Sequence, residues 1–289
     1  MDLGVILPSG VPGVDGRVVL DWARRAELSG VFTTVAAADR FSYDNYDAIT
    51  TLAAVAGATE RMLLMPYVSV APLKAPNVWA KEIATLSRLA PGRLRVGVGV
   101  GARPNDYASA GVAWDERGAR MDAALEALAA LRERPDDPQL LGPRADDVPV
   151  YIGGSSPPAL RRLVRHGAGF VHGGLRPEVF ALQAQAVRAA WAESGRAGSP
   201  RLIASTWYAS CTDAGDAADA WMQEYFVQGG PPEQVRDDIS RGPQAVRDVV
   251  AAFQSAGADE VILFPCVPDL AELDFLIEAV GDLATTAAA

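Results

Sequence analysis

The sequence predicts an α/β fold, a TIM barrel of eight parallel strands and eight helices, built as a single domain over residues 1–289. Short apolar runs alternate with longer amphipathic stretches along the chain, which is the pattern of consecutive βαβ units. Eight strand-and-helix units follow one another, and no linker divides them. A barrel of this kind takes about 250 residues, which suits the length of this chain. These observations favour one barrel over a doubly wound sheet.

The first four units fill the N-terminal half of the chain. Gly30 ends the first expected helix, Pro72 and Pro76 punctuate the loop before the third, and Pro91-Gly92 marks the turn that follows it. The expected strands are 3–8, 31–36, 62–70 and 93–100, and the expected helices are 17–28, 47–58, 77–89 and 115–132.

In the last four units, apolar runs again alternate with helix signals. Ser156 followed by Pro157 starts one helix, because serine caps a helix and proline is tolerated in its first turn. A Gly/Pro-rich segment divides the helical region after the seventh strand. The expected strands are 148–152, 169–173, 201–210 and 260–265, and the expected helices are 157–166, 177–193, 214–227, 243–256 and 270–283.

Composition argues against several partners. The formal net charge is −10, so the chain lacks the basic face that nucleic acid or a membrane surface requires. No apolar run approaches the roughly 20 residues that span a bilayer, and no basic region precedes the apolar N-terminal run, so we expect neither a membrane anchor nor a signal peptide. Two cysteines, Cys211 and Cys266, make no disulfide framework, which favours a reducing, cytoplasmic setting.

The active site of such a barrel forms from the loops that follow the carboxyl ends of its strands. The candidate residues are therefore those that end or follow each strand. They are Asp39, Arg40, Phe41 and Tyr43 after the second strand, Tyr67, Val68 and Ser69 at the end of the third, Gly99, Gly101 and Arg103 after the fourth, Gly153, Gly154, Ser155 and Ser156 after the fifth, His172 at the end of the sixth, and Trp207 in the seventh.

Two glycine-rich strand ends indicate a bound ligand. Glycine at 97, 99 and 101 leaves one side of the fourth strand bare, so that a flat ring can lie there, although tight packing of barrel layers is the alternative. The stretch 153–156 opens a helix whose amides and positive end favour an anion, although a plain capped helix start is equally common. Together with Arg103, these stretches predict a phosphate cradle. Neither matches a Walker loop or G-x-G-x-x-G.

Few side chains suggest other chemistry. His172 suits an acid–base role or a hydrogen bond to a ring, with a plain rim position as the alternative. Asp39 beside Arg40 is the best charged pair in a loop, although such neighbours more often form a solvated turn. Histidine and cysteine are too few and too scattered for a zinc site, so no metal is expected. No G-x-S-x-G elbow of a hydrolase occurs.

Seven segments in this order resemble the bacterial luciferase-like superfamily of flavin-dependent oxidoreductases. Each motif is loose by itself, but the ordered set is specific, and the resemblance covers nearly the whole chain. The segments are 58–61, 84–87, 91–94, 96–101, 118–122, 152–157 and 259–265.

The resemblance implies an oxidoreductase whose redox partner is reduced FMN or coenzyme F420, an 8-hydroxy-5-deazaflavin, with the cofactor phosphate near the loops after the fourth and fifth strands. It also implies a bulge with a non-prolyl cis peptide at Tyr67-Val68, against the ring. Arg40 stands where many relatives carry a histidine. Arginine cannot act as a general base at neutral pH, but it can hold an anionic substrate or a flavin oxygen.

Three hypotheses follow. The leading one is a luciferase-like monooxygenase that uses reduced FMN and oxygen on a small organic substrate, with a separate flavin reductase as a further partner. The second is F420-dependent hydride transfer, and the third is a flavin-free member that binds a ligand or catalyses a non-redox step. Phe41, Tyr43 and Trp207 are expected in the substrate pocket. The resemblance also implies a homodimer through the second and third helices, with Trp79 and Ile83 as apolar anchors.

Overall fold

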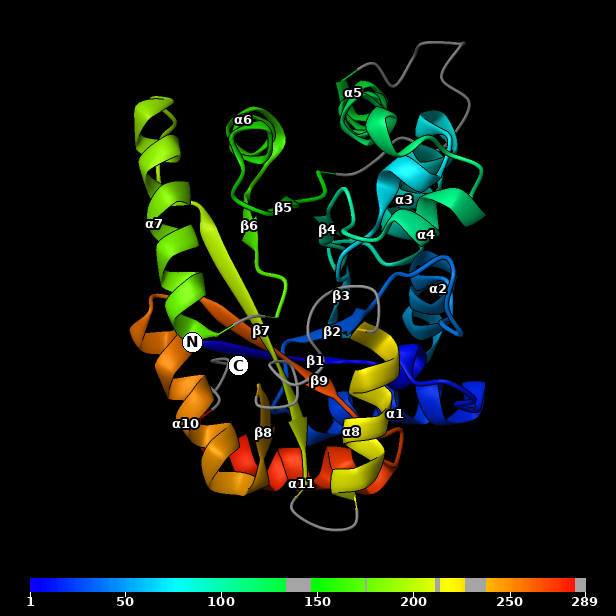
Figure 1. The fold of residues 1–289 in the computed structure, drawn as a ribbon, viewed down its shortest axis with the longest axis vertical. Coiled ribbons are helices and arrows are strands. Elements are labelled where there is room, and N and C mark those ends of the chain that lie inside the picture. The colour runs from blue at the N-terminus through cyan, green and yellow to red at the C-terminus, as the bar shows by residue number, and fades with distance from the viewer. Residues whose placement is uncertain (134–146, 175, 211–213, 227–237, 284–289) are drawn as a thin grey trace.

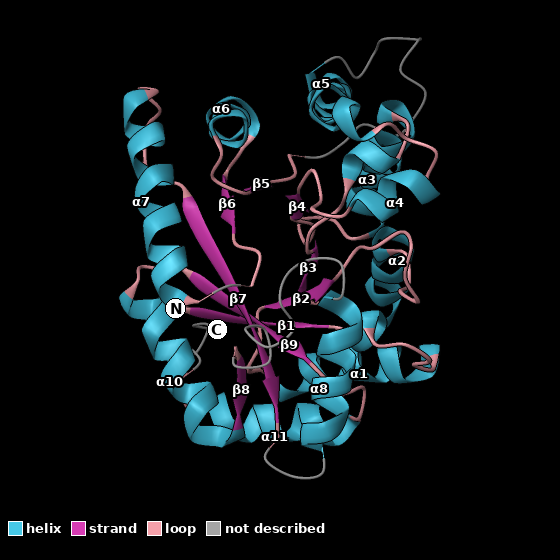
Figure 2. Cartoon of the chain, in the orientation of Figure 1, coloured by secondary structure: helices cyan, strands magenta, loops and turns pink. Residues whose placement is uncertain are grey.

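A computed structural model describes residues 1–133, 147–174, 176–210, 214–226 and 238–283, so Cys211 lies outside the described residues. Helices surround a set of parallel strands (Figures 1 and 2). The strands are β1 (Asp2–Ile6), β2 (Thr34–Ala37), β3 (Leu63–Pro66), β4 (Val96–Val98), β5 (Val150–Gly153), β6 (Gly169–Val171), β7 (Arg201–Ala209), β8 (Ile239–Arg241) and β9 (Glu260–Pro265).

The helices alternate with these strands, as the sequence predicts. Asp15 and Asp47 cap two of them by accepting hydrogen bonds from first-turn amides. The helices are α1 (Gly16–Ser29), α2 (Ala48–Ala58), α3 (Pro76–Leu89), α4 (Pro104–Ser109), α5 (Arg117–Glu133), α6 (Pro157–His166), α7 (Pro177–Glu193), α8 (Ala214–Phe226), α10 (Gly242–Ser255) and α11 (Leu270–Val280). None of them is both long and apolar enough to cross a bilayer, as far as the described ranges extend.

Eight strands close into a barrel in the order β3-β2-β1-β9-β7-β6-β5-β4. Isolated bridges from Leu64 to Leu94 and from Ser69 to Val98 join the two ends of this order. The predicted barrel is therefore confirmed. The sequence did not predict β8, which pairs with the carboxyl end of β7 and sets Ile239 beside Trp207.

Two other elements differ from the prediction. The third strand was expected over 62–70, but β3 ends at Pro66, and the Tyr67-Val68 peptide bond just beyond it is cis. This confirms the bulge that the resemblance implies. Helix α4 was not predicted. Pro104 opens it, because proline fits the first turn of a helix.

The core has two layers. Residues such as Met65, Ile203 and Ile262 fill the inside of the barrel, and a larger layer lies between strands and helices. Trp79 and Ile83 belong to this outer layer and are fully buried, so they do not serve as exposed dimer anchors. They lie on the inner face of α3, which packs against the barrel.

Candidate active site

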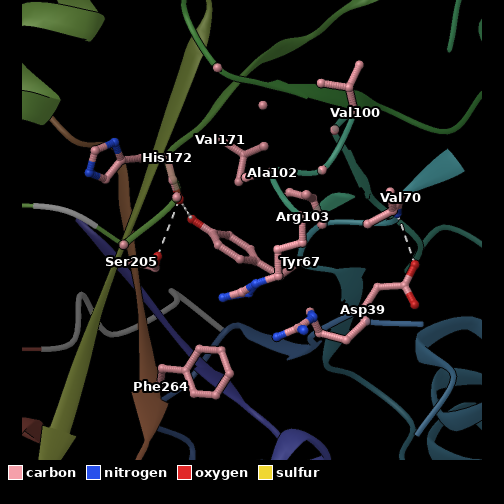
Figure 3. A pocket seen from close by; sticks show the side chains of 18 of the residues that line it. Asp39, Tyr67, Val70, Val100, Ala102, Arg103, Val171, His172, Ser205 and Phe264 are labelled. Carbon is pink, nitrogen blue, oxygen red and sulfur yellow. Dashed lines mark hydrogen bonds between the residues drawn. The ribbon is translucent and has the colours of Figure 1, made fainter. Parts of the chain in front are cut away.

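A cavity of about 400 Å³ lies at the carboxyl ends of the strands, where the fold places active sites. Figure 3 shows that Asp39, Tyr67, Arg103 and Phe264 surround one space. The lining residues come from loops after most of the barrel strands. They are Asp39, Arg40, Tyr67, Val68, Val70, Gly99, Val100, Gly101, Ala102, Arg103, Asp106, Gly153, Gly154, Val171, His172, Gly173, Gly174, Ser205, Trp207, Tyr225 and Phe264.

The bulge after β3 explains the glycine run of β4. A Cβ atom at Gly97 would lie 2.6 Å from the Pro66 carbonyl oxygen, and one at Gly99 would lie 3.0 Å from the Val68 side chain. The glycines at 97 and 99 are therefore required by the protein's own packing, which was the alternative at the sequence level. Their absent side chains let Val68 reach the pocket floor.

Other glycines do present bare backbone to open space. A Cβ atom at Gly173 would meet nothing within 4 Å, and one at Gly154 would meet only Ala159 at 3.9 Å. Both residues line the pocket. Ser156 is the N-cap of α6 and makes no side-chain hydrogen bond to the helix, and prolines occupy the first helical positions. Because proline has no N–H, this helix start offers fewer donors to an anion than the sequence reasoning assumed.

Asp39 lines the pocket and does not pair with Arg40. Its carboxylate accepts a hydrogen bond from the Val70 amide at 3.0 Å (Figure 3). Burial raises the pKa of Asp39 to about 6, although the Val70 amide acts in the opposite direction. Asp39 can therefore both accept and release a proton near neutral pH.

Arg40 pairs instead with Asp106, a residue the sequence reasoning missed. The Arg40 Nε atom lies 3.2 Å from Asp106 Oδ2, and both side chains are more than nine-tenths buried. Asp106 also accepts hydrogen bonds from the amide and hydroxyl of Ser42, at 2.8 and 2.7 Å. It therefore joins α4 to the loop after β2 and holds Arg40 at the pocket.

Tyr225 of α8 brings Arg40 and Arg103 together. The guanidinium carbons lie 5.1 and 4.6 Å from the centre of the Tyr225 ring, within the range of cation–π contacts. Trp221 stacks on the same ring at 5.0 Å. Arg103, which is 9% exposed, thus lies beside the β2 loop and α8. The sequence reasoning had assigned it to a cofactor phosphate.

His172 lies at the pocket, but its side chain is directed away from the cavity. Val171 faces the inside of the barrel, so the next side chain faces outward. The imidazole Nδ1 lies 2.8 Å from Gln183 Oε1, and the ring packs edge-on against Phe180. In Figure 3 the ring points away from the pocket. His172 contributes its backbone, whose carbonyl accepts a hydrogen bond from the Tyr67 hydroxyl at 2.7 Å.

Five further expected residues, Phe41, Tyr43, Ser69, Ser155 and Ser156, are not among those that line the cavity. The Ser69 hydroxyl accepts a hydrogen bond from Trp79 Nε1 at 3.0 Å, so it faces α3. Phe41 is 54% exposed and does not line the cavity. Tyr43 lies behind the lining, edge-on to Tyr225 and beside Arg40. Trp207 does line it.

Four of the lining residues that the sequence does not predict share one property. Asp106 and Tyr225 lie on helices, and Phe264 and Ser205 lie within strands, so none follows a strand end directly. The alternation of side chains in β7 and β9 was a signal for the strand residues, because every second one must face the barrel. No local signal marked Tyr225.

Comparison with known families gives one match over most of the chain. The sequence model described as luciferase-like monooxygenase matches residues 1–260. Among curated proteins, an F420-dependent glucose-6-phosphate dehydrogenase of Nakamurella multipartita is 33% identical over 135 residues, 42% of this chain and 40% of that protein. A 5,10-methylenetetrahydromethanopterin reductase of Methanolobus tindarius is 24% identical over 260 residues, 84% of this chain and 77% of that protein. Matches to the first relatives thus span less than half of their length.

Solved structures share the fold at low sequence identity. An F420-dependent secondary alcohol dehydrogenase, determined in complex with an F420-acetone adduct, has a TM-score of 0.83 at 18% identity, with 98% of this chain and 99% of that chain covered. The monooxygenase RslO1 from Streptomyces bottropensis has a TM-score of 0.79 at 18% identity, with 99% and 100% covered. At this identity the similarity shows the barrel alone.

Proposed function

This chain belongs to the luciferase-like monooxygenase family, and from that premise we propose that it transfers a hydride between coenzyme F420 and a small alcohol or its carbonyl product. Its relatives are oxidoreductases, and so is this chain. The observation that carries the finer proposal is Asp39, a pocket carboxyl whose pKa burial raises to about 6. Oxidation of an alcohol releases a proton as well as a hydride, so it needs such an acceptor.

The pocket fits a flat cofactor with an anionic tail. Bare backbone at Gly154 and Gly173 would allow a ring or a phosphate to approach closely, because a side chain there would fill open space. Val68 would support the ring from the β3 bulge, and Gly153 and Gly154, which line the cavity, would let the tail approach the backbone. When bound, the cofactor supplies the two-electron hydride acceptor or donor.

The chain's own residues would manage protons and water. Asp39 would take the hydroxyl proton of the substrate, and would return it in the reverse reaction. Tyr67, Trp207 and Phe264 form apolar walls that exclude water from the reacting atoms. The Tyr67 hydroxyl already donates to the His172 carbonyl oxygen, and burial raises its pKa, so it stays protonated.

The comparisons support F420 ahead of FMN without deciding between them. Several curated relatives are F420-dependent enzymes, and so is one of the structural relatives with the same barrel. A second candidate is a monooxygenase that uses reduced FMN and oxygen. The match to the family model described as luciferase-like monooxygenase and the apolar walls of the pocket favour it.

Anaerobic titration with coenzyme F420 and with FMN, each oxidised and reduced, tests the proposal. We expect tight F420 binding and loss of its visible absorbance when a panel of small alcohols is added. Asp39→Asn should keep the affinity for F420 and slow the absorbance change about 100-fold. Binding of reduced FMN alone, followed by oxygen uptake, would establish the second candidate. Binding of neither would leave the flavin-free alternative.

A further inference from the structure

We propose that the indole ring of Trp207 separates the active-site cavity from a second cavity, and that this ring sets the length of the substrate that the site accepts. This inference rests on the proposed function, because it states which alcohols the redox site takes. The substrates are short alcohols whose apolar chain ends at Trp207. Removal of the ring would admit alcohols with a longer chain.

Two cavities meet at Trp207. The active-site cavity has a volume of about 400 Å³, and the second cavity has a volume of about 340 Å³. Trp207 and Gly174 line both of them. The second cavity lies beside β8 and the first halves of α7 and α10, where Pro177 and Ala245 line it. A shorter side chain at position 207 would therefore join the two cavities.

The strands on either side of β7 support the same division. Trp207 pairs with Ile239 of β8 on one side and with Phe264 of β9 on the other. Ile239 lines only the second of the two cavities, and Phe264 lines only the active-site cavity. The boundary between the cavities thus falls at Trp207. Because β7 is hydrogen-bonded on both sides here, loss of the ring should leave the strand in place.

Gly174 holds the indole in position. A Cβ atom at Gly174 would lie 2.7 Å from Cη2 and 2.8 Å from Cζ2 of Trp207, so the six-membered ring rests against the bare backbone. Gly174 also has a φ of 72°, a conformation that favours glycine. The side chain of Trp207 is therefore packed as a wall, and the residue is only 6% exposed.

The lining of the second cavity suits an alkyl chain. Pro177, Ile239 and Val249 give it apolar walls. Arg176 and Asp238 also line it and form an ion pair at 2.6 Å, and the Arg176 side chain is 56% exposed. The charged groups therefore belong to the solvent side of the cavity, and its apolar walls would cover the end of a chain that passes position 207.

The length dependence of alcohol binding measures the position of the wall. Each methylene that is buried in an apolar site tightens binding about fourfold. Once the chain reaches a fixed ring, a further methylene gains no burial or collides with the ring. The affinity should then stop rising with chain length, and we call this length the break.

Isothermal titration calorimetry with the straight-chain alcohols from 1-butanol to 1-decanol tests the inference on the cofactor-free protein. We expect a break in the wild type, and we expect Trp207→Ala to extend the fourfold gain per methylene beyond it. Trp207→Val keeps a β-branched residue in the strand and should extend the gain in the same way, so the test does not depend on one variant folding. Circular dichroism checks that each variant is folded.

Two further variants distinguish a second cavity from a simple gain of room. Phe264→Ala removes a ring that borders only the active-site cavity, so it should move the break less than Trp207→Ala does. Ala245→Phe, added to Trp207→Ala, fills the second cavity from α10 and should move the break back toward the wild-type length.

The same length dependence in the wild type and in both Trp207 variants, including no binding at any length, would overturn the inference. So would an equal shift from Phe264→Ala, or a double variant that keeps the full shift. Titration with F420 is read separately. If the wild type bound no F420 but Trp207→Ala moved the break, the proposed function would fail and the division of the cavities would remain.

Discussion

The two ends of the barrel carry charged clusters that behave in opposite ways. At the amino ends of the strands, Glu260 is fully buried and lies 2.8 Å from Arg95 and 3.0 Å from Arg201. Its other oxygen accepts a hydrogen bond from the Thr34 hydroxyl at 2.5 Å. Asp2 adds a second carboxylate to Arg201. This end is a closed network in which every charge has an opposite neighbour.

At the carboxyl ends, Arg40 pairs with Asp106, and the guanidinium of Arg103 lies over the ring of Tyr225 beside them. Burial lowers the pKa of both Arg201 and Arg103, but Glu260 and Asp2 outweigh it at Arg201, so the pKa of Arg201 rises and that of Arg103 falls. The difference teaches that one end of the barrel uses charge for stability. At the other end, desolvation is the largest influence on Arg103 and is not outweighed by nearby carboxylates. This contrast can be tested by perturbing each end in turn.

The largest effect is expected from Glu260→Ala. The substitution leaves Arg95 and Arg201 without their shared carboxylate and should lower the free energy of unfolding by about 3–5 kcal/mol. Urea denaturation measures it, and Glu193→Ala on the exposed end of α7 is the control. The affinity for F420 at the opposite end of the barrel should not change in the protein that remains folded. A loss below about 1 kcal/mol would show that the network is not closed.

Asp39→Asn is expected to have a smaller effect, and it should raise the free energy of unfolding relative to the wild type. The folded-state pKa of Asp39, about 6, lies above the ordinary value of 3.8, so the folded state holds the proton more tightly than the unfolded state. The stability that this gives is complete below pH 4 and is lost as the pH rises to about 6. The variant avoids this loss, which is at most about 3 kcal/mol. Its unfolding free energy should therefore gain on the wild type between pH 4 and 6.5, and a pH-independent difference would contradict the raised pKa.

The sequence predicted the barrel fold better than it predicted the side chains of the candidate active site. Strand and helix alternation is a local signal, and the order of motifs placed the Tyr67-Val68 bulge correctly. The position of His172 at the pocket was predictable, but the direction of its ring was not, because only the register of the strand before it decides which way the ring faces. Tyr225 and Asp106 were missed because they reach the pocket from helices, and their contacts with Arg103 and Arg40 join residues far apart in the chain.

The smallest effect on stability is expected from Arg103→Met, and it is the sharpest test of the contrast. Methionine fills similar volume without the charge, and Asp106 keeps its partner Arg40. The free energy of unfolding should change by less than about 1 kcal/mol, or rise as the repulsion with Arg40 disappears. Arg201→Met is the matched variant at the other end. Its free energy of unfolding should fall by at least about 2 kcal/mol, because Glu260 and Asp2 lose a shared cation. Equal losses from the two variants would mean that Arg103 contributes as much to the stability of the folded protein as Arg201 does, and would contradict the contrast between the two ends.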